Sequence, residues 1–210
     1  MREMAMRIGG STELRLRPFG HGVAAMAAVG ILLGLAASAL AQDSQSFQVG
    51  AVKVTKIYKP EKTLQLEVEV PASPEAVWEA FSTADGLKTW LGPEAEVEMR
   101  PGGNWLVKFP GASTGGGNVL EFVEGKSITI AAMAPDSFPT VRRERTRAVF
   151  DFEASPDGKS TIVRLTQTGW KAGEEWDKAF EYLAKGNPML LAMLRQRFTS
   201  GPIDWAAMMK

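Results

Sequence analysis

The stretch from residue 64 to residue 103 most constrains the fold, because its hydrophobic pattern changes from period two to helical spacing and back. Apolar and polar residues alternate over residues 64–70, which predicts a half-buried strand. Ser73 can accept a hydrogen bond from an unpaired helical amide, and Pro74 suits the first helical position, so we expect a helix there. Its apolar stripe consists of Val77, Trp78 and Phe81. A second short helix follows and leads to Trp90.

Strand-like alternation recurs six more times further along the chain. The predicted strands lie around residues 95–99, 105–109, 120–122, 128–130, 142–154 and 161–168. Residues 110–117 between two of them are rich in Gly, Ser and Thr. This segment lacks the Lys and the following helix of a phosphate-binding P-loop, so we interpret it as a hairpin loop.

The last third of the chain changes to helical spacing. Apolar residues recur at that spacing from residue 176 to 183, and Gly186 interrupts the pattern. Asn187 and Pro188 then predict the cap and the first residue of another helix, which ends before Gly201. The order of elements predicts an α+β fold with about seven antiparallel strands and a long C-terminal helix. A helix across a curved antiparallel sheet can leave a cavity lined by aromatic and aliphatic side chains.

The N-terminal residues 1–41 have the pattern of a secretory signal peptide. Four arginines precede an apolar run from Val23 to Leu40, and Ala39-Leu40-Ala41 offers a cleavage site. We therefore expect cleavage after Ala41 and a periplasmic or secreted protein. The alternative is an uncleaved anchor helix, because the run is at the short end of a membrane span. Residues 42–62 are interpreted as a polar lead-in with room for a short edge strand.

Charge and composition narrow the possible partners. The chain carries 24 basic and 24 acidic residues, and the leader contains four of the former and two of the latter. This near balance gives no electrostatic footprint for nucleic acid or anionic membranes. The only His is His21 in the leader, and there is no Cys. We therefore expect no transition metal, no cofactor and no Ser–His or Cys–His nucleophile pair.

Several short segments resemble the activator of Hsp90 ATPase homologue-like domains of the START-like helix-grip (SRPBCC) superfamily, in particular exported bacterial members. They are Pro71–Trp90 with its Leu87-x-x-Trp90, Arg100-Pro101-Gly102-Gly103, Leu165–Trp170, Glu174-Glu175-Trp176 and Gly201–Trp205. The resemblance implies one helix-grip (START/Bet v 1-like) domain over residues 63–206, with seven strands gripping the terminal helix. The superfamily carries apolar small molecules, and some members are cyclases, lyases or hydrolases. The chaperone-ATPase activity behind the family name needs cytosolic partners that an exported protein should not meet.

The candidate ligand-binding residues are the large apolar side chains expected on the inner faces of the sheet and the terminal helix. They are Trp90, Trp105, Phe109, Phe122, Phe150, Phe152, Met193 and Phe198. We name no catalytic residue. The glutamates at 67, 69, 94, 96 and 98 alternate with apolar residues, which indicates a solvated strand face rather than paired catalytic carboxylates.

The densest basic cluster lies at the start of the predicted sixth strand. Alternation there would place Arg143, Arg145 and Arg147 on one face and Arg142 on the other. One interpretation is a solvated edge that blocks strand addition, and the other is an anion-binding rim at the mouth of a cavity.

Three functional hypotheses follow. The leading one is an exported, non-enzymatic domain that binds a small apolar molecule between the sheet and the terminal helix. The second is a cyclase, lyase or hydrolase with a buried carboxylate, Lys or Tyr as acid or base, which would require a shifted pKa in the pocket. The third is a protein-interaction or chaperone-accessory domain, which predicts a large exposed apolar patch or an exposed tail with Ile203 and Trp205.

Overall fold

The computed structural model of the chain describes residues 43–111, 114–156 and 158–208. The signal peptide predicted over residues 1–41 lies outside these residues. Within the described ranges, no helix combines the length and the apolar character that a membrane crossing requires.

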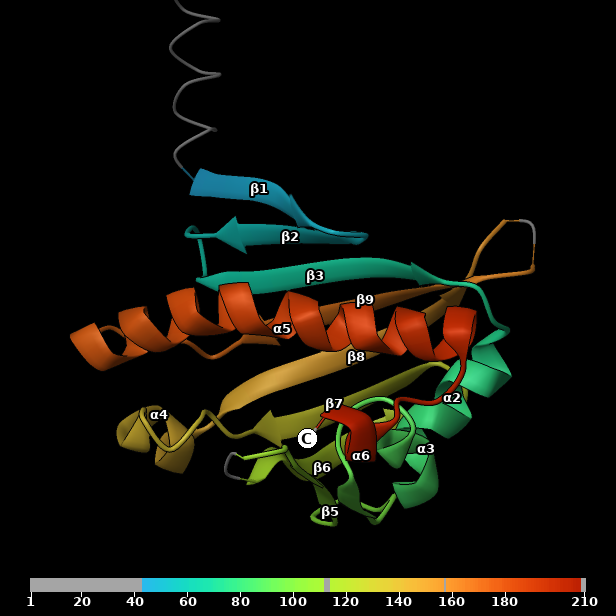
Figure 1. Cartoon of the computed structure of the whole chain (residues 1–210). Helices are drawn as coiled ribbons and strands as arrows, with labels where there is room; N and C mark the ends of the chain where they lie inside the picture. Colours follow the sequence, from blue (N-terminus) through green and yellow to red (C-terminus); the bar gives the residue numbers. More distant parts are fainter. Residues whose placement is uncertain (1–42, 112–113, 157, 209–210) are drawn as a thin grey trace, which may run out of the picture. The chain divides into compact units, whose positions relative to one another are not determined.

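The described residues form one curved antiparallel sheet of nine strands, with a long C-terminal helix across it (Figure 1). The strands follow the order β1-β2-β3-β9-β8-β7-β6-β5-β4 across the sheet. Their bounds are β1 Ser44–Val49, β2 Val52–Ile57, β3 Thr63–Val70, β4 Glu94–Val97, β5 Asn104–Lys108, β6 Thr114–Val123, β7 Ser127–Ala132, β8 Thr146–Ala154 and β9 Thr161–Thr168. The predicted α+β helix-grip fold is confirmed.

The sheet has two strands more than the seven predicted, and both come from the expected polar lead-in. β1 and β2 form an antiparallel hairpin, and β2 pairs with β3 so that Val54 lies opposite Leu66. Val52 and Val54 are fully buried. The lead-in therefore contributes apolar side chains to the core. The sequence did not predict this contribution, because most residues of the segment are polar.

The five described helices are α2 Pro74–Ser82, α3 Ala84–Lys88, α4 Pro139–Glu144, α5 Glu174–Ser200 and α6 Trp205–Met208. The predicted start of α2 is confirmed, because the Ser73 hydroxyl accepts a hydrogen bond from the amide of Ala76 at 3.4 Å. Thr83 caps α3 in the same way, with its hydroxyl 2.9 Å from the amide nitrogen of Gly86.

Two predictions about strands are wrong. Residues 142–154 do not form one strand, because the chain is helical in α4 up to Glu144 and only then enters β8. The predicted loop at residues 110–117 ends earlier than expected, since β6 begins at Thr114. Gly115, Gly116 and Gly117 pair there with β5, and at Gly116 and Gly117 the backbone of a neighbouring strand approaches too closely for a side chain. A Cβ atom on Gly117, for example, would lie 2.1 Å from the carbonyl oxygen of Ala131.

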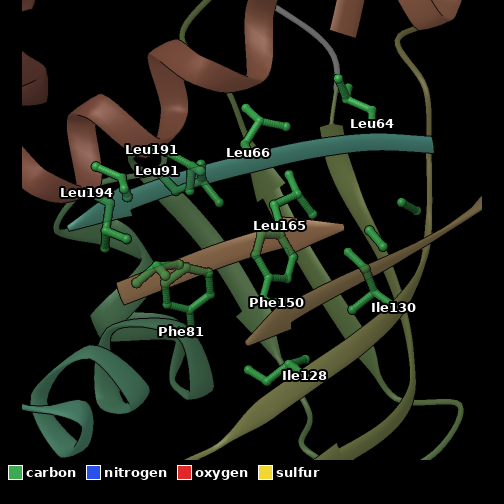
Figure 2. Close-up of a cluster of buried hydrophobic side chains, with 14 of the residues drawn as sticks. Leu64, Leu66, Phe81, Leu91, Ile128, Ile130, Phe150, Leu165, Leu191 and Leu194 are labelled. Atoms are coloured by element: carbon green, nitrogen blue, oxygen red, sulfur yellow. The ribbon is translucent and has the colours of Figure 1, made fainter. Parts of the chain in front are cut away.

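The predicted break at Gly186 is also wrong, because α5 runs without interruption through Gly186 and Pro188 (Figure 1). An interior Pro removes one helical hydrogen bond and usually costs about 3 kcal/mol. Buried residues on both sides of Pro188 offset this cost, among them Phe180, Leu191 and Leu194. Figure 2 shows Leu191 and Leu194 on the side of the helix that faces the sheet. Tertiary packing therefore holds the helix together where its local sequence would end it.

The core is centred on Phe81, which is fully buried at the end of α2. Its ring lies 4.8 Å from that of Trp90, 4.9 Å from that of Phe152 and 5.2 Å from that of Phe150. Figure 2 shows Phe81 and Phe150 close together beneath the leucines of α5. These centroid distances and tilted orientations are typical of favourable aromatic pairs.

A carboxylate distant in the sequence caps helix α4. Its N-terminal residue Phe138 makes no side-chain cap, but Glu175 at the start of α5 accepts hydrogen bonds from the amides of Thr140 at 2.6 Å and Val141 at 3.1 Å. Desolvation raises the pKa of Glu175, whereas these hydrogen bonds and the charge of Arg143 lower it, and the lowering prevails. A group whose pKa is lowered in the folded protein stabilises it above the ordinary carboxyl pKa of about 4.3.

We expect Glu175→Ala to release α4 while the rest of the fold persists. Hydrogen exchange at the amides of Thr140 and Val141 should become several-fold faster, because two helical donors lose their acceptor. The wild-type protection of these amides should fall as the pH drops through the lowered pKa of Glu175, and the variant should not show this step. Glu174→Ala is the matched control, since Glu174 only pairs with Lys178 at the surface. Equal protection in both variants would contradict this account.

Candidate functional site

A pocket of about 320 Å³ lies between the sheet and α5. Strands β5 to β9, the end of α3 and the middle of α5 all contribute to it. The sheet side includes Trp105, Phe109, Ile130, Ala132, Ala148, Phe150, Leu165 and Gln167. The side formed by α5 includes Tyr182, Leu183, Gly186, Asn187, Leu190 and Leu191. The remaining lining consists of Trp90 and Leu91, which follow α3, and of Thr114, Gly115, Gly116, Met133 and Pro135. The pocket is thus mainly apolar and aromatic, with few polar groups.

The pocket is open because α5 packs most closely on β2 and β3, at one side of the sheet. Two of the lining residues on β7 and β8, Ala132 and Ala148, are small. On the helix, Gly186 carries no side chain, and a Cβ atom added to it would meet nothing within 4 Å. Small residues on both walls leave a volume that larger ones would fill.

The aromatic wall of the pocket is held in a fixed orientation. The indole nitrogen of Trp90 donates to the carbonyl oxygen of Ala80 at 2.9 Å, and that of Trp105 donates to Phe81 at 2.8 Å. Both indoles are almost completely buried. Because their only donors are already used, these two side chains present only ring surface to the pocket.

The polar groups of the pocket form a chain of side-chain hydrogen bonds. Gln167, which is 4% exposed, donates through Nε2 to the Thr146 hydroxyl at 2.7 Å. Its Oε1 accepts a hydrogen bond from Nδ2 of Asn187 at 3.3 Å. The chain links β8 and β9 to the middle of α5. On the rim, Tyr182 is 53% exposed and contacts the ring of Phe138 edge-on, with 5.4 Å between centroids.

No charged side chain lines this pocket within the described ranges of the chain. Arg142 of α4 lies beside it, where it donates to the carbonyl oxygens of Ala134 at 2.7 Å and Thr114 at 2.9 Å and pairs with Asp136 at 2.9 Å. Thr114 belongs to the lining, so Arg142 fixes part of the rim through contacts to the backbone. Its own donors are directed at protein acceptors.

The other arginines of the basic cluster do not share one strand face, which corrects the sequence prediction. Arg143 lies in α4 and pairs with Glu144, and only Arg147 lies in β8, where it pairs with Glu121. Arg145 follows α4 with a φ of 67°, a conformation rare for a residue with a side chain. Its Nη1 is buried and has no hydrogen-bond partner among the described residues. Burial and the nearby charge of Arg142 lower the pKa of Arg145.

The glutamates that alternate along the strands all lie outside the pocket lining and have polar neighbours. Arg164 pairs with both Glu67 and Glu153, and Glu69 accepts a hydrogen bond from Ser160. Near β4, the glutamates at 94, 96 and 98 contact Lys108, Asn104 and Arg100 respectively. These contacts belong to the solvated face of the sheet.

The structure brings four of the eight sequence-predicted site residues to the pocket: Trp90, Trp105, Phe109 and Phe150. Phe122 and Phe152 instead contact Trp78, with ring centroids 6.2 Å and 6.1 Å away. Met193 lines a second depression, beside Ile203 and Met208. Phe198 is partly buried against the core, with the guanidinium of Arg197 over its ring at 4.6 Å.

Sequence reasoning missed the polar part of the pocket. Gln167 has the same strand parity as the buried residues Val163 and Leu165, so a polar residue at an inward position was the available signal. The sequence predicts that Gly186 and Asn187 separate two helices, and this prediction gives no sign of their place in the pocket wall.

The fold and the pocket define a helix-grip protein of the α+β class. Within that class, the chain belongs to the family described as "Activator of Hsp90 ATPase homolog 1-like protein", whose profile matches residues 71–199. No curated protein sequence matches this chain. β1 and β2 lie N-terminal to the matched region.

Solved structures share the fold at low sequence identity. The protein MLL2253 from Mesorhizobium loti is 18% identical over 67% of this chain and 99% of its own, with a TM-score of 0.56. The Aha1 dimer from Colwellia psychrerythraea is 20% identical over 66% of this chain and 97% of its own, with a TM-score of 0.54. CalU16 from Micromonospora echinospora is 15% identical over 79% of this chain and 86% of its own, with a TM-score of 0.50.

Two glycines of the pocket wall should respond in opposite directions to the same substitution. Gly186→Ala should raise the free energy of unfolding by about 0.5–1 kcal/mol, because Ala is the better helix former and its methyl group meets no atom. Gly116→Ala should lower it by more than about 1 kcal/mol. There φ is 98°, and a Cβ atom would lie 2.1 Å from the carbonyl oxygen of Trp105. Denaturant unfolding of both variants tests this, and a destabilising Gly186→Ala would contradict the open space at that position.

Proposed function

We propose that this chain is an exported domain that binds a small, largely apolar molecule in the pocket between the sheet and α5. The observation that carries the proposal is the pocket itself, about 320 Å³ in volume and lined by aromatic and aliphatic side chains from both layers. This volume falls within the range of about 300–1,000 Å³ that is typical of small-molecule sites. A few polar groups converge at one part of the lining, as such sites also require.

The rigidity of the pocket supports binding. Hydrogen bonds to Ala80 and Phe81 fix the indoles of Trp90 and Trp105, so a ligand need not order these side chains when it enters. Ordering rotamers at an interface otherwise costs affinity. The wall is therefore preorganised for an apolar ring or chain.

The electrostatics of the pocket favour binding over acid–base chemistry. In the described part of the chain, the lining includes no carboxylate and no Lys. Its one tyrosine, Tyr182, lies on the rim and is 53% exposed, so it is not the buried acid or base that the enzyme alternative requires. Burial raises the pKa of Asp151, but in the strand register this residue lies opposite Ser127 and Arg164, at the opposite parity to the pocket residue Phe150. Asp151, whose pKa is the one raised among the carboxyl groups of the described residues, thus faces away from the pocket.

The C-terminal segment gives little support to the protein-interaction hypothesis. The amide of Ile203 donates to the carbonyl oxygen of Thr89 at 2.9 Å, and the indole of Trp205 donates to that of Lys88 at 2.5 Å. Arg197 adds a hydrogen bond to the Thr89 hydroxyl at 3.0 Å. Both apolar residues are therefore docked on the end of α3 and do not form an exposed tail.

We expect the chain isolated from its own cells to carry a small molecule that native mass spectrometry detects. Gly186→Leu should abolish this bound mass, because the new side chain extends into the pocket. Lys185→Leu is the matched control, with the same new side chain on the exposed side of α5, and should retain the ligand. A bound mass that survives Gly186→Leu would contradict the proposed site, and a chain without any bound mass would favour the protein-interaction alternative.

The proposal of export makes a separate prediction. The protein recovered from the periplasmic or secreted fraction should begin at Gln42, because the Ala39-Leu40-Ala41 site would be cleaved. N-terminal sequencing of the fractionated protein tests this. Ala41→Lys should block cleavage and leave the longer form, whereas an intact N-terminus in the wild type would favour the anchor alternative.

A further inference from the structure

We propose that the pocket selects a neutral ligand with an aromatic body and one hydrogen-bonding group, and that Asn187 of α5 binds this group. The inference rests on the proposed function and adds the class of ligand and the residue that orients it. Three independent features of the pocket carry it: its lack of charge, its chain of amide hydrogen bonds and the unusual local sequence of α5.

The lack of charge selects against an ionised ligand. The described lining contains no Asp, Glu, Lys or Arg. A charged group carried into such a site would lose its hydration without gaining an opposite charge, which is strongly unfavourable. Arg142 lies close to the rim, but its guanidinium already contacts Ala134, Thr114 and Asp136. The ligand is therefore neutral where it is enclosed.

The chain of amides leaves one acceptor for the ligand. Gln167 donates a hydrogen bond through Nε2 to Thr146 and accepts one at Oε1 from Asn187, so both ends of its amide have partners. Through Nδ2, Asn187 is held in one orientation. Its Oδ1 makes no hydrogen bond to any part of the chain that the structure describes, and the residue lines the pocket. A ligand hydroxyl or N–H group can donate to this oxygen.

The local sequence of α5 is poor for a helix at the place where the helix passes the pocket. Gly186, Asn187 and Pro188 are all unfavourable in a helix interior, yet they stand in the middle of a helix from Glu174 to Ser200. Pro188 also leaves the buried carbonyl oxygen of Ala184 without its usual amide donor. Natural proteins depart from local preferences mainly where function requires it. Here the departure places an open position and an amide beside the cavity.

The indoles of Trp90 and Trp105 indicate how the ligand is oriented in the pocket. Trp90 and Trp105 use their indole donors on the backbone and offer only ring surface. The polar group of a ligand therefore finds no hydrogen-bond partner on the indoles, whereas its aromatic rings can pack against them. The ligand then lies with its rings against the indoles and its hydrogen-bonding group at α5.

Three probes of similar shape test the inference at pH 7: naphthalene, neutral 2-naphthol and the anion 2-naphthoate. Binding is followed through the indole N–H resonances of Trp90 and Trp105 in NMR titrations. 2-Naphthol should bind the wild type about 3- to 12-fold more tightly than naphthalene, the effect of one hydrogen bond. 2-Naphthoate should bind at least about tenfold more weakly than 2-naphthol, because its charge has no partner in the lining.

The variant Asn187→Leu should bind 2-naphthol and naphthalene equally, while naphthalene keeps its wild-type affinity. Lys185→Leu is the matched control and should retain the preference for 2-naphthol. Asn187→Ala repeats the test with a smaller side chain, in case Leu disturbs Gln167. Backbone amide resonances outside the pocket that match those of the wild type verify that each variant is folded.

The outcomes separate the inference from the proposed function. Equal affinities of naphthalene and 2-naphthol in the wild type would overturn the role of Asn187. A preference that survives the double variant Asn187→Ala/Gln167→Leu would also overturn it, because this variant removes the Gln167 acceptor that either single variant leaves without its donor. Tightest binding of 2-naphthoate would overturn neutrality and indicate an anion site at Arg142 and Arg145. If no probe shifts the indole resonances, the proposed binding function itself fails.

Discussion

The structure depends on the hydrogen bonds that two buried indoles donate to the end of α2. The last carbonyl groups of a helix lack intrahelical donors and need other partners when they are buried. Trp90 and Trp105 supply those donors to Ala80 and Phe81. The same contacts lock the ring of Phe81 into the aromatic core and turn two flat surfaces toward the pocket. One interaction thus stabilises a helix end and shapes the pocket wall.

The position of α5 follows from where its apolar stripe finds partners. The helix packs against β2 and β3, and β2 belongs to the hairpin that precedes the family-matched region. Buried Val52 and Val54 therefore supply part of the surface that holds the helix. Because the helix is anchored at one side of the sheet, a space remains between α5 and the central strands, and this space is the pocket.

Charge is separated from the pocket throughout the domain. On the outer face, Arg164 bridges Glu67 and Glu153, and exposed pairs of this kind contribute little stability individually. On the inner face, the polar residues of the pocket are neutral amides and hydroxyls, which can be buried when they bond one another. Gln167 illustrates this, since both Thr146 and Asn187 contact its amide.

The sequence by itself determined the alternating strands, the caps at Ser73 and Gly201 and the inward parity of Trp105 and Phe150, because period and cap chemistry are local properties. Only the tertiary structure decided the rest of the site. Glu175 caps helix α4, which includes residues 142–144 that the sequence predicted as strand, although 35 positions separate it from Thr140. The burial of apolar residues on both sides of Pro188 likewise joins the two predicted C-terminal helices into the single helix α5, which places Asn187 at the pocket. These outcomes depend on long-range contacts, whose energies exceed the local preferences that a sequence pattern displays.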